Sequence, residues 1–166
     1  MSAFAELLEV ISHAPTKKRA ITNHAVLNEA FAYAKPSAFS RGMRIDLGSV
    51  TILLISGTAS IDEDGKSVHL GDFRAQMRRT LANIGGLLAS EGCTWHDIVR
   101  TTCYLRDIER DYEAFNEERA AFYKEQGLDP LPASTGIQAI LCRPELLIEI
   151  EAIAMFRTEQ ASAGKE

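Results

Sequence analysis

Two carboxylates stand two residues apart in an otherwise apolar segment near the end of this 166-residue chain. In Leu146–Phe156 the even positions are all apolar, while Glu149 and Glu151 share the odd positions with large apolar side chains. This alternation predicts a strand, on which side chains two apart share one face at roughly 6.6 Å. At that spacing each carboxylate influences the proton affinity of the other. Glu149 is therefore a candidate general acid or base in a pocket, the alternative being a partly solvated sheet face or ion pairs with a neighbouring chain.

Cysteine and histidine spacing indicates no other reactive centre. Cys93, Cys103 and Cys142 lie far apart, without a C-x-x-C pair or a histidine at ligand spacing. Neither a zinc site nor a disulfide framework is expected, and the thiols are predicted to be reduced and buried.

Composition and charge exclude several classes of protein. With 46% hydrophobic and 25% charged residues, the chain has the composition of one ordinary globular domain. The net charge of −5 argues against a surface built to bind a phosphate backbone, so nucleic acid is not expected as a partner. No apolar run approaches the ~18 residues of a membrane span. We therefore expect a cytoplasmic location and no membrane partner.

Apolar periodicity predicts the elements that hold the carboxylates. Met43–Leu47 and Val50–Ile55 form a predicted hairpin, whose second strand is apolar enough to be covered on both faces. That strand ends at Ser56-Gly57-Thr58, and an Asp64-Gly65 turn follows. A short helix from Ser2 to Ile11 precedes these elements and ends before Pro15 and the basic residues 17–19.

Two longer helices and three more strands complete the predicted pattern. The first predicted helix is capped by Asp72, ends at Gly92 and leaves Arg74, Arg78 and Arg79 to solvent. The second predicted helix is capped by Asp107 or Asp111 and ends at Gly127. The predicted strands are Ile98–Leu105, Thr135–Leu141 and Leu146–Phe156. We divide the chain into an N-terminal extension (1–34), a domain (35–157) and a flexible tail (158–166).

Several short segments, in this order and spacing, resemble the RidA/YjgF family, also called the L-PSP endoribonuclease-like family. The likeness covers about Lys35 to Arg157. The segments that carry it are Ser56-Gly57-Thr58, Gln76 with Leu81-Ala82-Asn83-Ile84, Arg100–Asp107, Phe115-Asn116, Pro132-Ala133 and Ile148–Ala154.

The resemblance implies an α+β, chorismate-mutase-like fold, in which two helices back a mixed β-sheet, and a homotrimer with clefts between subunits. Two helices with single apolar stripes cover only one sheet face, which agrees with the other face packing in an oligomer. Family members of the deaminating type hydrolyse small enamines and imines to 2-keto acids and ammonia, without a metal or organic cofactor. A small-molecule substrate and no cofactor are therefore expected.

The resemblance also locates the site residues. Glu149 matches the family's pocket glutamate, thought to position or activate the attacking water, and Gly57 matches a backbone contact to the ligand. Phe115 and Asn116 match residues near the cleft, although Phe115 also belongs to the apolar stripe of its helix. The candidate substrate-binding residues are Phe39, Ser40, Arg41, Gly57, Thr58, Phe115, Asn116, Ser134 and Thr135.

Two departures from the family pattern predict an altered specificity. Where the family has P-A-R-S, with an arginine that clamps the substrate carboxylate, this chain has Ser134, and the lost charged pair is worth about 1.5–3 kcal/mol. This loss disfavours small 2-imino acids as substrates. Where the family commonly has Y-S-Q-A, residues 39–42 supply an apolar wall in Phe39 and a new cation in Arg41. Arg41 is a candidate anion-binding group or, alternatively, part of a surface or intersubunit salt bridge.

Three functions fit these residues. The first is a hydrolase or deaminase of enamines or imines, with Glu149 as the base and Ser134, Thr135 and Arg41 orienting the substrate. The second is a non-enzymatic trimer that binds a small metabolite or partner protein. The third is hydrolysis of an enol ether, because residues 39–41 and 56–61 are also similar to chorismatases.

Overall fold

One mixed sheet of six strands forms the centre of the computed structural model, which describes residues 17–157. The strand order is β1-β2-β3-β6-β4-β5, and β4 and β5 are the parallel pair. The strands are β1 (Lys17–Ala20), β2 (Gly42–Leu47), β3 (Val50–Ala59), β4 (Ile98–Leu105), β5 (Ala133–Gln138) and β6 (Ile148–Arg157).

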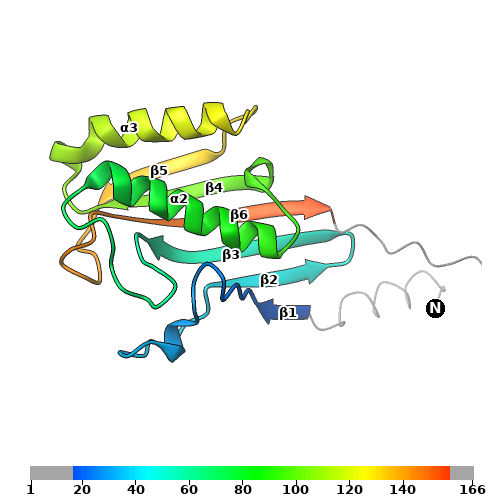
Figure 1. Cartoon of the computed structure of the whole chain (residues 1–166). Coiled ribbons are helices and arrows are strands. Elements are labelled where there is room, and N and C mark those ends of the chain that lie inside the picture. The colour runs from blue at the N-terminus through cyan, green and yellow to red at the C-terminus, as the bar shows by residue number, and fades with distance from the viewer. Residues whose placement is uncertain (1–16, 158–166) are drawn as a thin grey trace, which may run out of the picture.

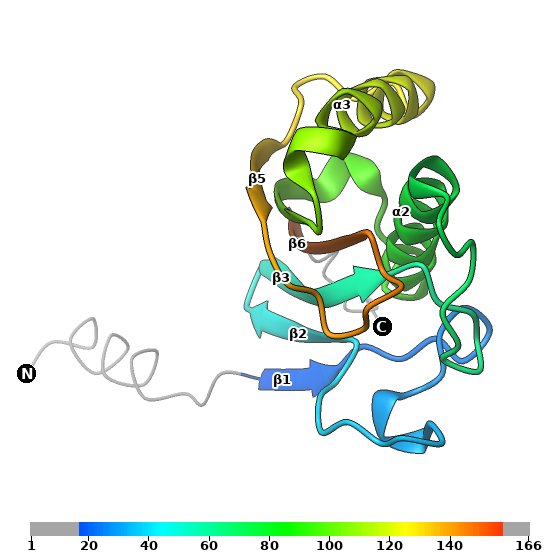
Figure 2. The same cartoon turned by 90° about the vertical axis from the view of Figure 1, so that its left-hand side faces the viewer.

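Helices α2 (Phe73–Ser90) and α3 (Ile108–Glu125) lie side by side on the same face of this sheet (Figures 1 and 2). Short 3-10 turns, η1 (Ala30–Ala32) and η2 (Trp95–Asp97), complete the helical elements described. The two long helices confirm the prediction of an α+β fold with one sheet face covered. The other face of the sheet carries no helix from the described residues (Figure 2).

Aspartates cap both long helices. The Asp72 carboxylate accepts from the Ala75 amide at 2.9 Å, and the Asp107 carboxylate accepts from the Arg110 amide at 3.0 Å. Asp107 is thus the second cap; Asp111, the other candidate, is buried and pairs with the Arg110 guanidinium at 2.6 Å.

The three arginines of α2 form ion pairs or hydrogen bonds with other elements. Arg78 Nη1 lies 2.8 Å from Glu118 Oε1 of α3, and Arg74 pairs with Glu117 and Glu118. Arg79 donates from Nε to the Ile61 carbonyl at 3.1 Å. The side chains of Arg74 and Arg78 are 43% and 60% exposed, as the sequence predicted, and their ion pairs also join α2 to α3.

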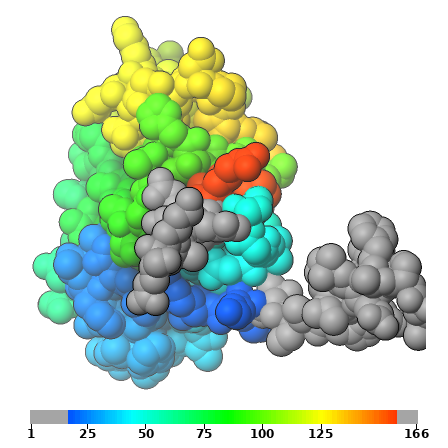
Figure 3. Space-filling view, turned by 90° about the vertical axis from the view of Figure 1, so that its right-hand side faces the viewer, coloured from blue at the N-terminus to red at the C-terminus, as the bar shows by residue number. Residues whose placement is uncertain are grey.

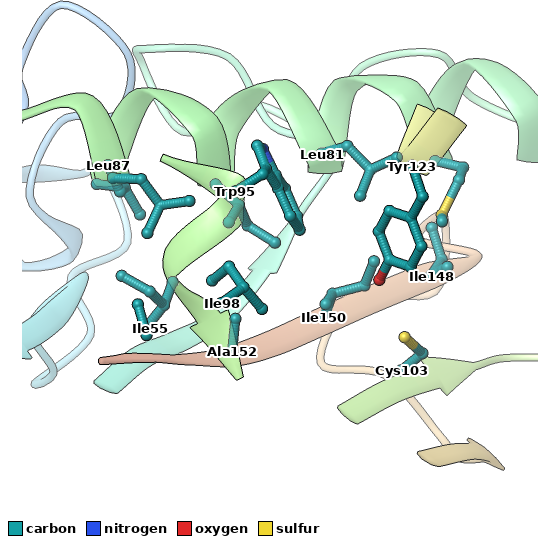
Figure 4. Packing of buried hydrophobic residues seen from close by; sticks show 14 of the residues in the cluster. Ile55, Leu81, Leu87, Trp95, Ile98, Cys103, Tyr123, Ile148, Ile150 and Ala152 are labelled. Atoms are coloured by element: carbon teal, nitrogen blue, oxygen red, sulfur yellow. The ribbon is translucent and has the colours of Figure 1, made fainter. Parts of the chain in front are cut away.

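The hydrophobic core lies between the helices and the sheet. Figure 4 shows Leu81 and Leu87 of α2 above Ile150 and Ala152 of β6. The even residues of β6 face this layer, and each of Ile148, Ile150, Ala152 and Ala154 is at most 2% exposed. The odd residues face the uncovered side, as the alternation predicted.

The predicted hairpin is present as β2 and β3, and its turn lies beside the end of β6 (Figure 3). Only one face of β3 is covered in the single chain: Leu53 and Ile55 are buried, but Leu54 is 42% exposed. Past Ile55 the strand carries a β-bulge, because Ile55 pairs with Ala152 and Thr58 with Ile150. The two-sided burial expected of this strand is therefore not supplied within one chain.

The residues before β2 join the sheet. Lys17–Ala20 pairs with β2 as an edge strand, and Ile21 and Leu27 lie in the core. No strand was predicted there. The helix predicted from Ser2 to Ile11 and the tail 158–166 lie outside the described residues. Strand β5 begins two residues before its predicted start and ends three residues before its predicted end.

Candidate active site

Glu149 lies at the second position of β6, on the uncovered face of the sheet. Its neighbours Ile148 and Ile150 point into the core, so strand alternation turns Glu149 the other way. Across the sheet it pairs with Ala59 of β3 and Tyr104 of β4. The side chain is partly buried at the end of the sheet where β3 ends and β6 begins (Figure 1).

The bulge in β3 makes room for this carboxyl group. A Cβ atom added to Gly57 would lie 2.0 Å from Glu149 Oε1 and 3.0 Å from its Cδ. The Gly57 backbone is not in the left-handed region, so its conformation does not demand glycine. Glycine is required here for space, because the carboxyl group rests against the Gly57 backbone.

Burial and charge both raise the proton affinity of Glu149. Burial raises the pKa of its carboxyl group, and the negative charge of Glu151 raises it further. On the adjacent strand, burial and a hydrogen bond to Glu151 raise the pKa of Tyr104. A carboxyl group of this kind is poised to accept and return protons closer to neutral pH than an exposed glutamate.

A cavity of about 110 Å³ opens beside this carboxyl group. Four sequence-predicted residues line it together: Phe39, Arg41, Gly57 and Glu149. The remaining lining comes from Tyr33, Ala59, Ile61, Cys142, Arg143 and Leu146. One end of the sheet thus combines a carboxylate, two guanidinium groups and an apolar wall.

Arg41 forms part of this wall and is 4% exposed. Its Nε and Nη2 atoms donate to the Asn28 carbonyl oxygen at 3.0 and 2.9 Å. Its guanidinium carbon lies 4.8 Å from the centre of the Tyr33 ring and 5.3 Å from that of Phe39. Burial lowers the pKa of Arg41. The surface salt bridge considered from the sequence was therefore wrong, and Arg41 is a buried cation held between aromatic rings.

Sequence reasoning missed four other residues at this end of the sheet. The Tyr33 hydroxyl is buried without a hydrogen-bond partner among the described residues. The Arg143 guanidinium donates to the Gly65 carbonyl at 2.6 Å, and the Cys142 thiol is exposed rather than buried as predicted. Strand parity would have placed Tyr104 on the Glu149 face once the pairing of β4 with β6 was known, but the loop residues gave no such signal.

A second group of predicted residues lies elsewhere, between α3 and the edge strand β5. Asn116 and Ser134 line a cavity of about 650 Å³ there. Ser134 pairs with Thr101, a buried residue, so its side chain is on the helix-covered face. Thr135 has the opposite orientation and accepts from Arg100 Nη2 at 3.1 Å. Within one chain the structure therefore does not bring Asn116, Ser134 or Thr135 to Glu149.

The other predicted contacts have structural partners. Thr58 is 3% exposed, and its hydroxyl donates to the Ser56 carbonyl at 2.9 Å. The Ser40 carbonyl accepts from the Ser56 hydroxyl at 2.7 Å, which ties the 39–41 segment to the bulge. Phe115 is 1% exposed and belongs to the core.

Residues 17–157 contain no group of three or more histidine, cysteine or carboxylate side chains that could hold a metal ion. No helix in this part of the chain has the length and apolar character needed to cross a membrane.

Comparison with known proteins places this site in a family context. Residues 30–156 match the family model described as Endoribonuclease L-PSP. The chain is 35% identical over 103 residues to the 3-aminoacrylate deaminase RutC of Acinetobacter baylyi, covering 62% of this chain and 78% of the relative. It is 32% identical over 111 residues to a RutC family protein of Haemophilus influenzae, covering 67% and 82%.

Solved structures share the fold. The crystal structure of the YjgF gene product from E. coli superposes with a TM-score of 0.65 at 27% identity, covering 82% of this chain and 97% of that one. A Rid family protein, YyfA from Yersinia pestis, gives a TM-score of 0.67 at 29% identity, covering 83% and 98%. The chain thus has the RidA/YjgF fold.

Proposed function

The chain belongs to the Endoribonuclease L-PSP family, which includes the RidA/YjgF proteins, and from this premise we propose that it is a deaminase-type hydrolase of enamines or imines. The observation that carries the proposal is the Glu149 carboxyl group, partly buried in a cavity against the Gly57 backbone, with its pKa raised by burial and by Glu151. The similarity to a 3-aminoacrylate deaminase supports the same reaction class.

Hydrolysis of a C=N bond needs a group that moves protons between water and nitrogen. An enamine substrate first gains a proton on carbon and loses one from nitrogen, and so becomes the imine. Glu149 then takes a proton from water as the new C–O bond forms and passes it to the nitrogen. It next moves the proton of the new hydroxyl to the nitrogen as the C–N bond breaks, so that imine and water yield a carbonyl compound and ammonia.

The surroundings of Glu149 suit this task. A raised pKa means that the carboxylate is a stronger base, and its protonated form is still able to return the proton. The apolar side chains of Phe39, Ile61 and Leu146 line one part of the cavity and reduce access of bulk water. The reaction uses no metal or organic cofactor in this scheme.

We also propose that the active assembly is a homotrimer with its sites between subunits. Large apolar side chains on the uncovered sheet face support this: Leu54 is 42%, Ile137 is 42% and Met155 is 46% exposed. A face of this kind is buried by another copy in an oligomer. Light scattering on the purified chain should give about 55 kDa, three times the 18.3 kDa of one chain. A mass near that of one chain would refute the trimer.

The proposed activity is tested by ammonia release. An amino-acid oxidase generates 2-imino acids in the assay, and the chain is expected to accelerate their hydrolysis above the spontaneous rate. Glu149→Gln should lower this acceleration by about 10²–10⁴-fold. Glu109→Gln is the control, because it removes the same charge from an exposed position at the start of α3 that lines neither of the two cavities named above.

Two results would overturn the proposal. One is full activity in Glu149→Gln. The other is no acceleration by the wild-type chain with any imine or enamine; if small carboxylic acids still raised its melting temperature, the non-enzymatic binding function would replace the proposed one.

A further inference from the structure

The cavity between α3 and β5 has no role in the scheme above, although it contains a fixed cation. Arg119 of α3 lies beside Ser134, with Nη1 donating to the serine hydroxyl oxygen at 3.1 Å. Its Nη2 donates to Asn116 Oδ1 at 2.7 Å, and its guanidinium carbon lies 4.4 Å from the centre of the Phe115 ring. These three contacts orient the guanidinium along the edge of β5.

This cation is not neutralised by a carboxylate. Among residues 17–157, no aspartate or glutamate oxygen lies within 4.0 Å of Arg119, whereas Arg74, Arg78 and Arg110 each pair with at least one. The positive charge of Arg119 also acts on two buried neighbours. Burial raises the pKa of both Cys103 and Tyr123, and the charge of Arg119 opposes that rise in each case. Arg119 is therefore an oriented guanidinium group that has no carboxylate partner among the described residues and is free to pair with the carboxylate of a ligand.

The rest of the cavity indicates the chemistry of that partner. Lys124 adds a second cation, and Leu128, Leu131 and Ala120 provide apolar surface. The Ser134 hydroxyl and the Asn116 amide lie within reach of the same guanidinium. Two cations, polar donors and an apolar wall fit a small organic carboxylate better than a neutral or cationic molecule.

We propose that Arg119 binds the substrate carboxylate, supplying from helix α3 the guanidinium that the family pattern would place at Ser134. This inference rests on the proposed function. It also revises the expectation from the sequence that the loss of an arginine at Ser134 disfavours small 2-imino acids. The guanidinium reaches the Ser134 hydroxyl from another element, so the acidic substrate class is retained.

The placement requires two copies of the chain. Glu149 faces the uncovered side of the sheet, while Arg119 and Ser134 lie at the covered side of the β5 edge, in a separate cavity. One small substrate touches both groups only where the β5 edge of one copy meets the Glu149 cavity of the next. Arg119 is thus a specificity-determining residue that acts on the neighbouring subunit's Glu149 site.

A pair of substrates separates the role of charge from a structural role. The first is the 2-imino acid made from leucine by an amino-acid oxidase; the second is the carboxylate-free imine made from 3-methylbutylamine by a flavin-dependent amine oxidase. Arg119→Gln should lower kcat/KM for the imino acid by about 10–100-fold, mainly through KM, and leave the carboxylate-free imine unchanged. Arg78→Gln, which removes the same charge from the adjacent helix, should change neither.

Equal losses on both substrates would show that Arg119 only supports the fold and would refute the inference. Wild-type kinetics in Arg119→Gln would also refute the inference. If Glu149→Gln were inactive at the same time, the proposed function would still stand. If the wild-type chain hydrolyses no imine, 2-oxobutyrate serves as the probe: it should raise the melting temperature of the wild type and not of Arg119→Gln. Equal shifts, or no shift in either protein, would refute the inference.

Mixed assemblies test the placement across subunits. When Glu149→Gln and Arg119→Gln chains are refolded together at equal amounts, random assembly leaves about one site in four with both native residues. About a quarter of the wild-type activity should return. Activity no higher than that of the separate variants would show that both residues serve a site within one chain.

Discussion

The substitution Gly57→Ala tests whether Glu149 owes its position to the bulge in β3. The added methyl group would lie 2.0 Å from Glu149 Oε1, whereas ordinary contact begins at 3.4 Å. The carboxyl group must therefore move by about 1.4 Å, unless the backbone moves instead. The conformation of Gly57 is not left-handed, so alanine adds no backbone strain of its own.

A displacement of this size is large for catalysis. A misplacement of about 1 Å costs roughly a hundredfold in rate, so Gly57→Ala should lower kcat for imine hydrolysis by about 10²-fold. The assay is ammonia release from an oxidase-generated imine, with the melting temperature recorded for each variant. Glu149→Gln provides the second background, because a glycine that acts only through the Glu149 carboxylate loses its influence when that carboxylate is absent.

Two outcomes would refute this reasoning. A folded Gly57→Ala enzyme within a few-fold of wild-type kcat would show that the position of the carboxyl group does not limit the reaction. A further hundredfold loss on adding Gly57→Ala to Glu149→Gln would show that Gly57 acts through the substrate or the backbone, not through Glu149.

Three other predictions follow from the contacts of β6. Glu151→Gln should move the rise of kcat/KM with pH to lower pH, because Glu151 helps to raise the pKa of Glu149; an unmoved pH–rate profile would exclude Glu149 as the titrating base. Glu149→Gln should be more stable than wild type to urea at pH 7, because the pKa of Glu149 in the folded chain lies above the ordinary 4.5 and the stability of the wild type falls as pH rises through that folded-state pKa. The stability difference between the two proteins should vanish below pH 4.5, and its persistence there would contradict the prediction. Gln76→Leu should lower the free energy of unfolding by about 3 kcal/mol or more. The Gln76 side chain is buried, donates to the Glu145 carbonyl at 2.9 Å and accepts from the Leu147 amide at 2.8 Å. A loss below about 1 kcal/mol would show that these hydrogen bonds do not hold the start of β6.

Periodic elements were predictable from the sequence for a physical reason. Apolar residues recur at helical spacing in α2 and alternate in β6, and each pattern buries one face of its element. The alternation in β6 is enough by itself to assign Glu149 to the face opposite Ile148 and Ile150. Strand β1 was missed because Lys17–Ala20 is an exposed edge strand, whose pairing depends on β2 and not on an apolar pattern of its own.

The composition of the site was harder to predict, because it depends on loops and on the register between strands. Arg41 looked like a surface cation, but the loop turns it between Tyr33 and Phe39. Arg119 follows Phe115 by four residues on α3, and only the packing of α3 on β5 brings it to Ser134. No local pattern records contacts of this kind, since each joins segments that are placed by the rest of the fold.

Under the inference drawn above, Arg119 supplies at the Ser134 edge the charge that the family pattern would place at position 134. An arginine on β5 and an arginine on α3 reach the same edge of the sheet from different elements, and the parallel pairing of β4 with β5 fixes where that edge lies relative to the helix. A guanidinium at that edge can pair with a substrate carboxylate whichever element carries it. Substrate class therefore depends on the cations that surround Ser134 in space and not on the residue at position 134 alone, and the kinetics of Arg119→Gln on acidic and carboxylate-free imines measure that dependence.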